Sequence, residues 1–252
     1  MLLEAREVTY LYADGTPALD GVNLKIAAGD HLAVLGANGS GKSTLLRLLN
    51  GLLFSSSGTI LFKGRELDEG TLSEPAFRAE FRSSVGFVFQ NVDAQLFNAT
   101  VFEEVAFGPR QLGLSETEVK GRAEDVLEFL GISHLADRPP FRLSGGEKRK
   151  VAIASVLSMN PEVLVFDEPF LGLDPRSQAW LVNTIQQLQS AGKTTIIATH
   201  ALETLPRIAN KAVVLSEDHT LVSGDSVENT LGNLEMLWAV NLLERTPHEA
   251  NL

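Results

Sequence analysis

The stretch HLAVLGANGSGKS, residues 31–43, joins an apolar run to a glycine-rich loop and then to a helix pattern. The part from Gly36 to Ser43 matches GxxxxGKS/T at every fixed position, between a strand and a helix as this motif requires. Glycines let successive backbone N–H groups point at phosphate oxygens, and the helix start adds about half a positive charge. The alternative is a glycine-rich turn without a ligand. The residues predicted to bind nucleotide are Gly36, Asn38, Gly39, Ser40, Gly41, Lys42, Ser43 and Thr44.

Three of these side chains have separate predicted roles. Lys42 is expected to reach the β- and γ-phosphates, and the Ser43 hydroxyl is expected to ligate Mg²⁺. Thr44 is expected to support a contact with the α-phosphate through its backbone or its hydroxyl. The predicted ligands are therefore ATP and Mg²⁺.

An acidic strand end lies further along the chain. The run VLVFDEP, residues 163–169, is an apolar strand that ends in Asp167 and Glu168. Because side chains alternate along a strand, these carboxylates are expected to point in different directions. We predict that Asp167 holds Mg²⁺, and that Glu168 faces the water that attacks the γ-phosphate, as general base or by positioning it. The alternative is a carboxylate pair that only caps a sheet.

A second glycine motif, Leu143-Ser144-Gly145-Gly146-Glu147, lies between the loop and the acidic strand. It precedes the helix pattern EKRKVAIASVLSM, so Ser144, Gly145 and Gly146 form a second anion site at a helix start. The loop, this pentapeptide and VLVFDEP together resemble the nucleotide-binding subunits of ABC transporters, over nearly the whole chain. The resemblance implies an enzyme that hydrolyses ATP.

The resemblance extends to residues outside these motifs. His200, which ends the run KTTIIATH, is similar to the switch histidine that contacts the γ-phosphate. Gln90 is similar to the glutamine that meets Mg²⁺ and couples the ATP site to a membrane partner. The resemblance also implies a head-to-tail dimer with an identical or a related chain, in which the Ser144 motif closes over ATP on the other subunit's phosphate loop. Asp174 is then expected to contact across that interface.

Two residues depart from the commonest family pattern. Glu147 replaces a glutamine, and Ala201 follows His200 where an acidic residue is frequent. Glu147 would add negative charge near the partner's nucleotide if it pointed inward, and it would otherwise face solvent or fix a local cap. Neither change removes a group with a direct catalytic role.

Two tyrosines are candidates for contact with the base. Tyr10 and Tyr12 share one face of the first predicted strand, because strand side chains repeat with period two. ABC subunits stack an aromatic residue from this region on adenine, and the spacing to DGTPAL favours Tyr12 over Tyr10. The alternative is a tyrosine that packs on the core.

The segment from Asp93 to Pro109 is similar to energy-coupling-factor importers and to cobalt or nickel importers. The resemblance implies separate transmembrane subunits, a place on the cytoplasmic face of the cell membrane, and uptake of a metal ion or vitamin. There are three rival interpretations: a soluble ABC protein of another function, a nucleotide-dependent regulatory module, and a small-molecule kinase. The apolar residues of this segment would form a groove for a partner helix, the core of a helical lobe, or both: Leu96, Phe97, Val101, Phe102 and Val105.

Composition limits the classes of function. The formal net charge of −11 disfavours general nucleic-acid binding, which relies on neutralising phosphates. The basic run from Lys148 to Lys150 is expected to be a solvated helix face, and the alternative is a binding patch. Without cysteine, the chain has no disulfide, thiolate metal site or cysteine nucleophile. No stretch approaches the roughly 20 apolar residues of a membrane helix, and the N-terminus is not expected to be a secretory signal.

Alternating strand and helix patterns predict an α/β fold with a P-loop NTPase core and a mainly parallel sheet. Buried strands are expected at residues 31–35, 85–90, 163–167 and 194–199, and a helix at 43–53. The first thirty residues and residues 58–62 predict an antiparallel β subdomain, with a turn at Asp14-Gly15. Residues 213–222 predict a hairpin.

We predict one ABC ATPase domain over residues 1–252, with an inserted helical subdomain at about 91–145 and a C-terminal helical segment at about 225–252. The clearest helix of the insertion is expected at 116–130, and one final helix at about 227–243. Apolar residues at helical spacing in that final helix either cap the domain or join the dimer interface: Leu231, Leu234, Leu237 and Trp238.

Overall fold

The computed structural model describes residues 1–244, which form two compact units. The first unit consists of Met1–Ser73 and the described chain from Thr194 onward, and the second consists of Glu74–Lys193. The prediction of a single domain with an inserted helical subdomain stays a prediction. The part of the predicted C-terminal segment beyond Glu244 lies outside the described residues.

The first unit contains a parallel arrangement of strands around β3 (His31–Leu35). This strand pairs in parallel with β8 (Thr194–Ala198) on one side and β9 (Lys211–Leu215) on the other. Four of the five residues of β3 and all five of β8 are buried, as expected for strands covered on both faces. The predicted hairpin is confirmed, because β10 (Leu221–Ser226) runs antiparallel to β9.

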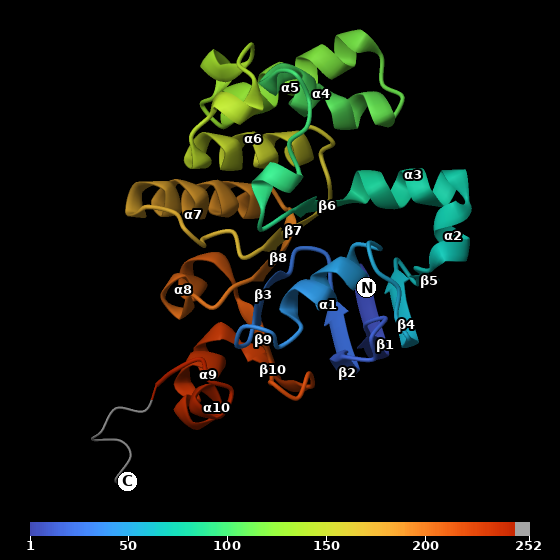
Figure 1. Ribbon diagram of the computed structural model, residues 1–252, viewed down its shortest axis with the longest axis vertical. Coiled ribbons are helices and arrows are strands. Elements are labelled where there is room, and N and C mark those ends of the chain that lie inside the picture. The colour runs from blue at the N-terminus through green and yellow to red at the C-terminus, as the bar shows by residue number, and fades with distance from the viewer. Residues whose placement is uncertain (245–252) are drawn as a thin grey trace. The chain divides into compact units, whose positions relative to one another are not determined.

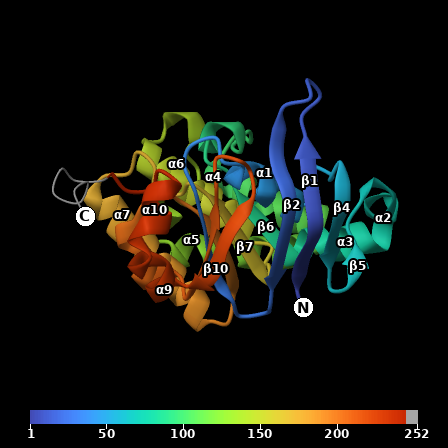
Figure 2. The ribbon, with the colours of Figure 1, turned by 90° about the horizontal axis from the view of Figure 1, so that it is seen from below.

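An antiparallel sheet completes the strands of the first unit, as predicted. Its order is β2 (Pro17–Ile26), β1 (Leu3–Leu11), β4 (Ser57–Phe62) and β5 (Arg65–Glu66), and the long strands lie side by side in Figure 2. β1 and β2 join at the predicted Asp14-Gly15 turn, where Gly15 has a φ of +84°. Gly58 has to be a glycine, since a Cβ there would lie 2.1 Å from the Glu7 carbonyl oxygen.

Helix α1 (Lys42–Leu49) follows the glycine loop and ends four residues before the predicted end at Leu53. Its four leucines, Leu45, Leu46, Leu48 and Leu49, are at most 1% exposed. The helix stops because Gly51 adopts a φ of +59°, and the N–H groups of Gly51 and Leu52 bond back to Leu48 and Arg47. The first unit also contains the short helices α2 (Glu69–Ser73) and α8 (Leu205–Ile208).

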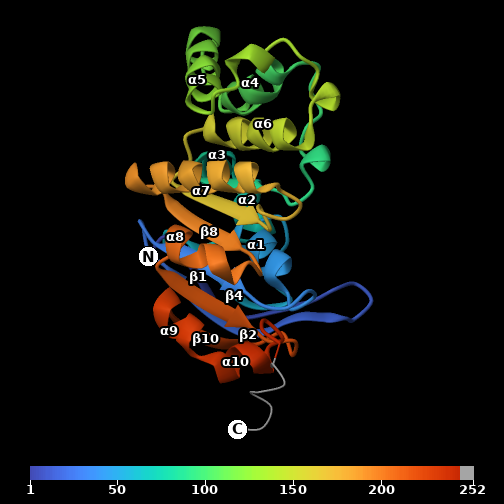
Figure 3. The same cartoon turned by 90° about the vertical axis from the view of Figure 1, so that its left-hand side faces the viewer.

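The predicted single C-terminal helix was wrong. The structure has two short helices, α9 (Val227–Gly232) and α10 (Leu234–Ala239), and both pack within the first unit (Figure 3). The chain breaks at Asn233, whose side chain accepts a 3.1 Å hydrogen bond from the Met236 N–H and caps the second helix. Leu237 is 1% exposed, and Leu231 packs on the core around Leu35 and Val214. This segment therefore caps its unit, while Leu234 stays 43% exposed.

The second unit combines two parallel strands with five α-helices and three short 3-10 helices, Val92–Ala94, Ser133–Leu135 and Pro140–Arg142. β6 (Val85–Val88) pairs with β7 (Val163–Asp167), and β6 ends two residues before the predicted end at Gln90. Helices α4 (Val101–Gln111) and α5 (Glu116–Phe129) lie within residues 91–145, so the predicted helical character of this segment is confirmed (Figure 1). The helices are α3 (Pro75–Ser84), α4 (Val101–Gln111), α5 (Glu116–Phe129), α6 (Gly145–Leu157) and α7 (Pro175–Ser190).

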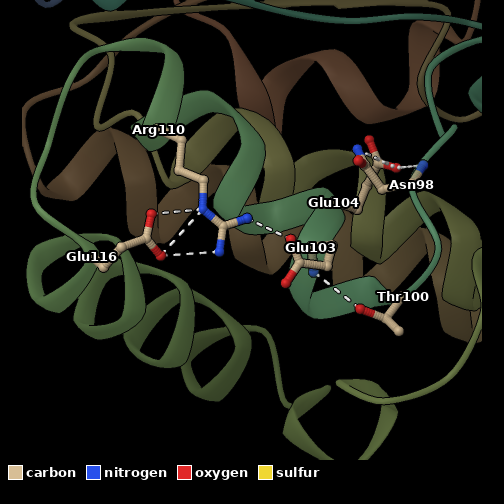
Figure 4. A network of polar contacts seen from close by, with 6 residues as sticks. All are labelled: Asn98, Thr100, Glu103, Glu104, Arg110 and Glu116. Carbon is tan, nitrogen blue, oxygen red and sulfur yellow. Dashed lines mark hydrogen bonds and ion pairs between the residues drawn. The ribbon is translucent and has the colours of Figure 1, made fainter.

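A polar network joins α4 to α5 and fixes the loop before α4 (Figure 4). Arg110 on α4 donates to Glu103 on the same helix and to Glu116 at the start of α5, at 3.0 Å from its Nε. Glu104 is 3% exposed and accepts from the backbone N–H groups of Phe97 and Asn98, at 2.9 and 2.7 Å. The Phe97 loop is therefore held by a buried carboxylate.

Candidate functional site

The glycine loop between β3 and α1 is shaped by backbone angles that few side chains tolerate. Gly39 and Gly41 have φ values of +86° and +103°, and Gly41 is the N-cap of α1. A Cβ on Gly41 would lie 2.1 Å from the Ala18 carbonyl oxygen. The loop therefore depends on glycine for its path, as the motif predicts.

Two buried polar side chains line this loop. The Lys42 ammonium donates to the carbonyl oxygens of Gly36 and Ala37, at 2.8 and 3.0 Å, and the residue is 6% exposed. The Ser40 hydroxyl is buried and has no hydrogen-bond partner among the described residues. A buried hydroxyl left unpaired costs about 1–3 kcal/mol, so this atom fits a ligand that brings acceptor oxygens. Lys42 and Ser40 are thus suited to a nucleotide phosphate.

Tyr12 lies next to this loop in the first unit. Its hydroxyl is 2.8 Å from the Thr44 hydroxyl, and its ring is perpendicular to that of Tyr10, with 5.2 Å between centroids. Tyr12 is 39% exposed, whereas Tyr10 is half-buried. Tyr12, which the sequence spacing favoured, is therefore the more accessible of the two tyrosines and lies beside the loop. Its contact with adenine stays a prediction.

His200 lies at the same edge of the parallel strands as the glycine loop. It follows β8, which pairs with β3, and the Thr199 N–H donates to the Val34 carbonyl at 3.1 Å. Ligands of parallel sheets collect beyond the carboxyl ends of the strands, and His200 is exposed there. The first unit thus brings together the phosphate loop, Tyr12 and His200.

The second unit carries the predicted carboxylates and Gln90 at one edge of its own strand pair. Asp167 ends β7 and is 1% exposed, and Glu168 is 7% exposed. Gln90 follows the parallel neighbour β6 and is exposed at the matching end. Glu168 has a φ of +45°, which a residue with a Cβ rarely adopts. Such backbone strain occurs at functional sites, and the role of this carboxylate stays a prediction.

Two helix starts in the second unit border a cavity of about 470 Å³. Ser144 caps α6, and Asp174 caps α7 by accepting from the N–H groups of Arg176 and Ser177, at 3.0 and 3.1 Å. The Ser177 hydroxyl also donates to Asp174, and these bonds lower the pKa of that carboxyl. The cavity is lined by Ser144, Gly146, Glu147, Lys150, Asp174, Arg176, Ser177 and Trp180.

Comparison with known proteins decides what these sites belong to. The family model described as ABC transporter matches residues 19–171, which include the phosphate loop, the Ser144 motif and β7. The chain belongs to the ABC transporter ATPases. It therefore binds and hydrolyses ATP, and its fold is that of an ABC ATPase.

Two relatives and two solved structures match nearly all of this ABC ATPase. EcfA of Methanothermobacter thermautotrophicus, an energy-coupling factor transporter ATP-binding protein, is 41% identical over 100% of the chain and 78% of its own length. LarO of Lactiplantibacillus plantarum, a nickel import ATP-binding protein, is 43% identical over 86% of the chain and 90% of its own.

CbiO1 from Clostridium perfringens, part of the ABC transporter complex CbiONQ, superimposes with a TM-score of 0.81 at 39% identity, covering 99% of this chain and 97% of its own. A dimeric cassette, MJ0796, bound to ADP and Pi, has a TM-score of 0.80 at 26% identity, covering 90% and 99%.

The basic run at the start of α6 was wrongly expected to be a solvated face of this ABC ATPase. Lys148 pairs with Asp93 at 2.6 Å, Arg149 is 7% exposed, and Lys150 lies 4.7 Å from the centre of the Trp180 ring. Sequence reasoning missed Lys150, Arg176 and Trp180 as residues that line the cavity. For Lys150 the available signal was a basic residue in the second turn of the helix that follows Ser144.

Gly41→Ala is expected to destabilise this ABC ATPase strongly and to prevent nucleotide binding. A positive φ costs an alanine about 1–3 kcal/mol, and the new Cβ would also collide with backbone atoms of residue 18. Chemical unfolding measures the loss. Gly64→Ala is the matched control, because Gly64 has a φ of +81° with nothing within 4 Å of the new Cβ. Equal losses for the two variants would contradict the tight fit at Gly41.

Proposed function

We propose that this ABC ATPase powers an importer of the energy-coupling-factor type, which takes up a metal ion or vitamin through separate membrane subunits. The single observation that carries the nucleotide role is the phosphate loop itself, with its buried Lys42 and unpaired Ser40 hydroxyl. Similarity to EcfA, LarO and CbiO1 supports the importer class.

The proposed reaction is attack of water on the γ-phosphorus of ATP. The bond to the bridging oxygen breaks, ADP leaves, and Glu168 accepts the proton of the attacking water or positions that water. Lys42 and His200 contact the γ-phosphate, and Gln90 couples the site to the membrane partner. Preformed donors and charge supply most of the catalysis.

Mg²⁺ is proposed as the resident cation, held by Ser43, Gln90 and Asp167. No group of three or more His, Cys, Asp and Glu side chains among residues 1–244 could hold a metal alone. The hydroxyl of Ser43, the amide oxygen of Gln90 and the carboxylate of Asp167 suit Mg²⁺. Proteins bind this ion with one or two carboxylates, while nucleotide phosphates supply further oxygens. The ion would neutralise the charge on the phosphates.

A head-to-tail dimer is the proposed active form. The Ser144, Gly145 and Gly146 segment of one subunit would cover ATP on the other, with Asp174 contacting across the interface. The exposed start of α6 and the adjoining cavity support this arrangement, as does the dimeric form of MJ0796 with ADP and Pi. An identical or a related chain is the second subunit, and nucleic acid is not a proposed partner.

The proposed contact with the membrane subunits uses the loop before α4. Val101 and Val105 are 0% exposed and belong to the core, which is the second of the roles predicted for this segment. Phe97 is 67% exposed and lies edge-on to Phe107, with 5.1 Å between centroids, on a loop that Glu104 holds in place. In residues 1–244 no helix has the length and apolar character needed to cross a membrane. The proposed location is peripheral, on the cytoplasmic face of the cell membrane.

Light scattering of the purified chain with Mg-ATP tests the dimer. Glu168→Gln is expected to accumulate as an ATP-bound dimer, because closure is retained while hydrolysis is slowed, and the wild type is expected to turn over. A variant that binds ATP but stays monomeric would contradict the homodimer.

Co-purification with membrane proteins tests the importer role. The membrane proteins recovered with the wild type are compared with those recovered with the Phe97→Ser variant. Equal recovery of the same proteins would contradict the Phe97 contact.

A further inference from the structure

The donors at the start of α6 are already engaged by a carboxylate of the same chain. The Ser144 backbone N–H and the Ser144 hydroxyl both donate to one oxygen of Glu147, each at 2.8 Å. The Ser144 oxygen accepts in turn from the Glu147 N–H at 3.4 Å, which completes a capping box. A serine hydroxyl has one proton, so this hydroxyl cannot also donate to an incoming phosphate.

Glu147 opposes an anion at this helix start in two ways. It occupies two donors, and its carboxylate brings a negative charge to the cavity that Ser144 and Gly146 line. The Ser144 backbone N–H, with its hydroxyl, lowers the pKa of Glu147, so the carboxylate is charged at neutral pH. Glutamine, which the commonest family pattern has at this position, would form the same capping box without the charge.

A cation that could pair with the Glu147 carboxylate lies nearby. The second oxygen of Glu147 lies 3.9 Å from the Arg138 guanidinium, whose side chain is 49% exposed. A change of Glu147 rotamer toward Arg138 would release both Ser144 donors and keep the charge paired.

We propose that Glu147 is an internal competitor for the phosphate-binding donors of Ser144, and that movement of its carboxylate toward Arg138 favours closure of the ATP dimer. This regulation rests on the proposed head-to-tail dimer. The Ser144 site then binds the partner's nucleotide at the expense of its own capping box. Closure is consequently weaker than in a chain with glutamine at this position.

The second unit supplies a matched control. Ser115 and Glu118 form the same capping box at the start of α5, with bonds of 3.0, 2.6 and 3.4 Å. Glu118→Gln removes one charge from an equivalent box that lines no part of the Ser144 cavity. Any difference between Glu147→Gln and Glu118→Gln therefore reports on the position and not on net charge or helix capping.

The experiment measures, by sedimentation equilibrium with Mg-ATP, the protein concentration at which half of the chains are dimeric. All variants carry Glu168→Gln, which keeps the nucleotide intact. Adding Glu147→Gln is expected to lower that concentration about tenfold, since a like-charge contact and a charged competitor are both removed. Adding Arg138→Gln is expected to raise it about threefold, and to have no effect once Glu147→Gln is present.

The outcomes separate this inference from the proposed function. If the parent binds ATP but never dimerises, both the homodimer and the role of Glu147 in its closure are overturned. If the parent dimerises, and Glu147→Gln behaves within twofold of Glu118→Gln, the dimer stands and the competition is overturned. If Arg138→Gln changes the dimerisation concentration equally with and without Glu147→Gln, Arg138 does not pair with the displaced Glu147 carboxylate, and that part of the inference is overturned.

Discussion

Replacing Lys42 with alanine is expected to lower the affinity for ATP by about 100-fold or more and to remove measurable turnover. Hydrogen bonds to charged groups contribute about 1.5–3 kcal/mol each, and every 1.4 kcal/mol is a factor of ten in affinity. The Lys42 ammonium lies inside the glycine loop, where its charge is shielded from water, and it is expected to bond two phosphate groups. Its loss removes the main cation that the chain offers to the nucleotide.

Titration of a fluorescent ATP analogue measures the affinity, and thermal unfolding checks the fold. The stability check is needed because Lys42 also ties the loop together through the carbonyl oxygens of Gly36 and Ala37. Lys120→Ala is the control, since the Lys120 side chain is 67% exposed on α5 and pairs only loosely with Glu124 at 3.7 Å. Affinity within threefold of wild type in folded Lys42→Ala would contradict the role of the ammonium.

The sequence predicted the strands best where apolar runs end in a motif. Residues 31–35 and 163–167 form β3 and β7 as expected, because continuous burial and the following polar loop define both ends. Helix ends were predicted less well. Leu52 and Leu53 continue the apolar pattern of α1, but the positive φ of Gly51 stops the helix first. The break at Asn233 was also missed because the apolar pattern hides it: leucines at helical spacing continue across this residue.

Within the sites, local hydrogen bonds could be predicted and distant ones could not. The Ser144 and Glu147 pair follows a known S-x-x-E pattern, so a local cap was among the expected roles of Glu147. The contact between Tyr12 and Thr44 joins residues 32 positions apart, and no pattern in either segment predicts it. The three basic residues at 148–150 contact three separate neighbours, which only the folded chain brings close to them: Asp93, the Phe89 carbonyl and the Trp180 ring.

Replacing Glu168 with glutamine is expected to reduce ATP turnover by about 10²–10⁴-fold while ATP affinity stays within a few-fold of wild type. General bases contribute acceleration of about this size, and glutamine keeps the shape of the side chain but cannot accept the proton of water. The backbone of Glu168 is held in the left-handed region just after β7, so the replacement has little freedom to move. Asp167, buried beside it, is retained to hold the cation.

Phosphate release under single-turnover conditions measures the chemical step apart from nucleotide exchange. Glu162→Gln is the matched control, because Glu162 is an exposed carboxylate at the opposite end of the same strand. It should hydrolyse ATP at the wild-type rate. A Glu168→Gln protein that binds ATP normally and keeps more than a tenth of the wild-type rate would show that another group activates the water. His200 would then be the first residue to replace, since it lies at a strand end with an exposed ring.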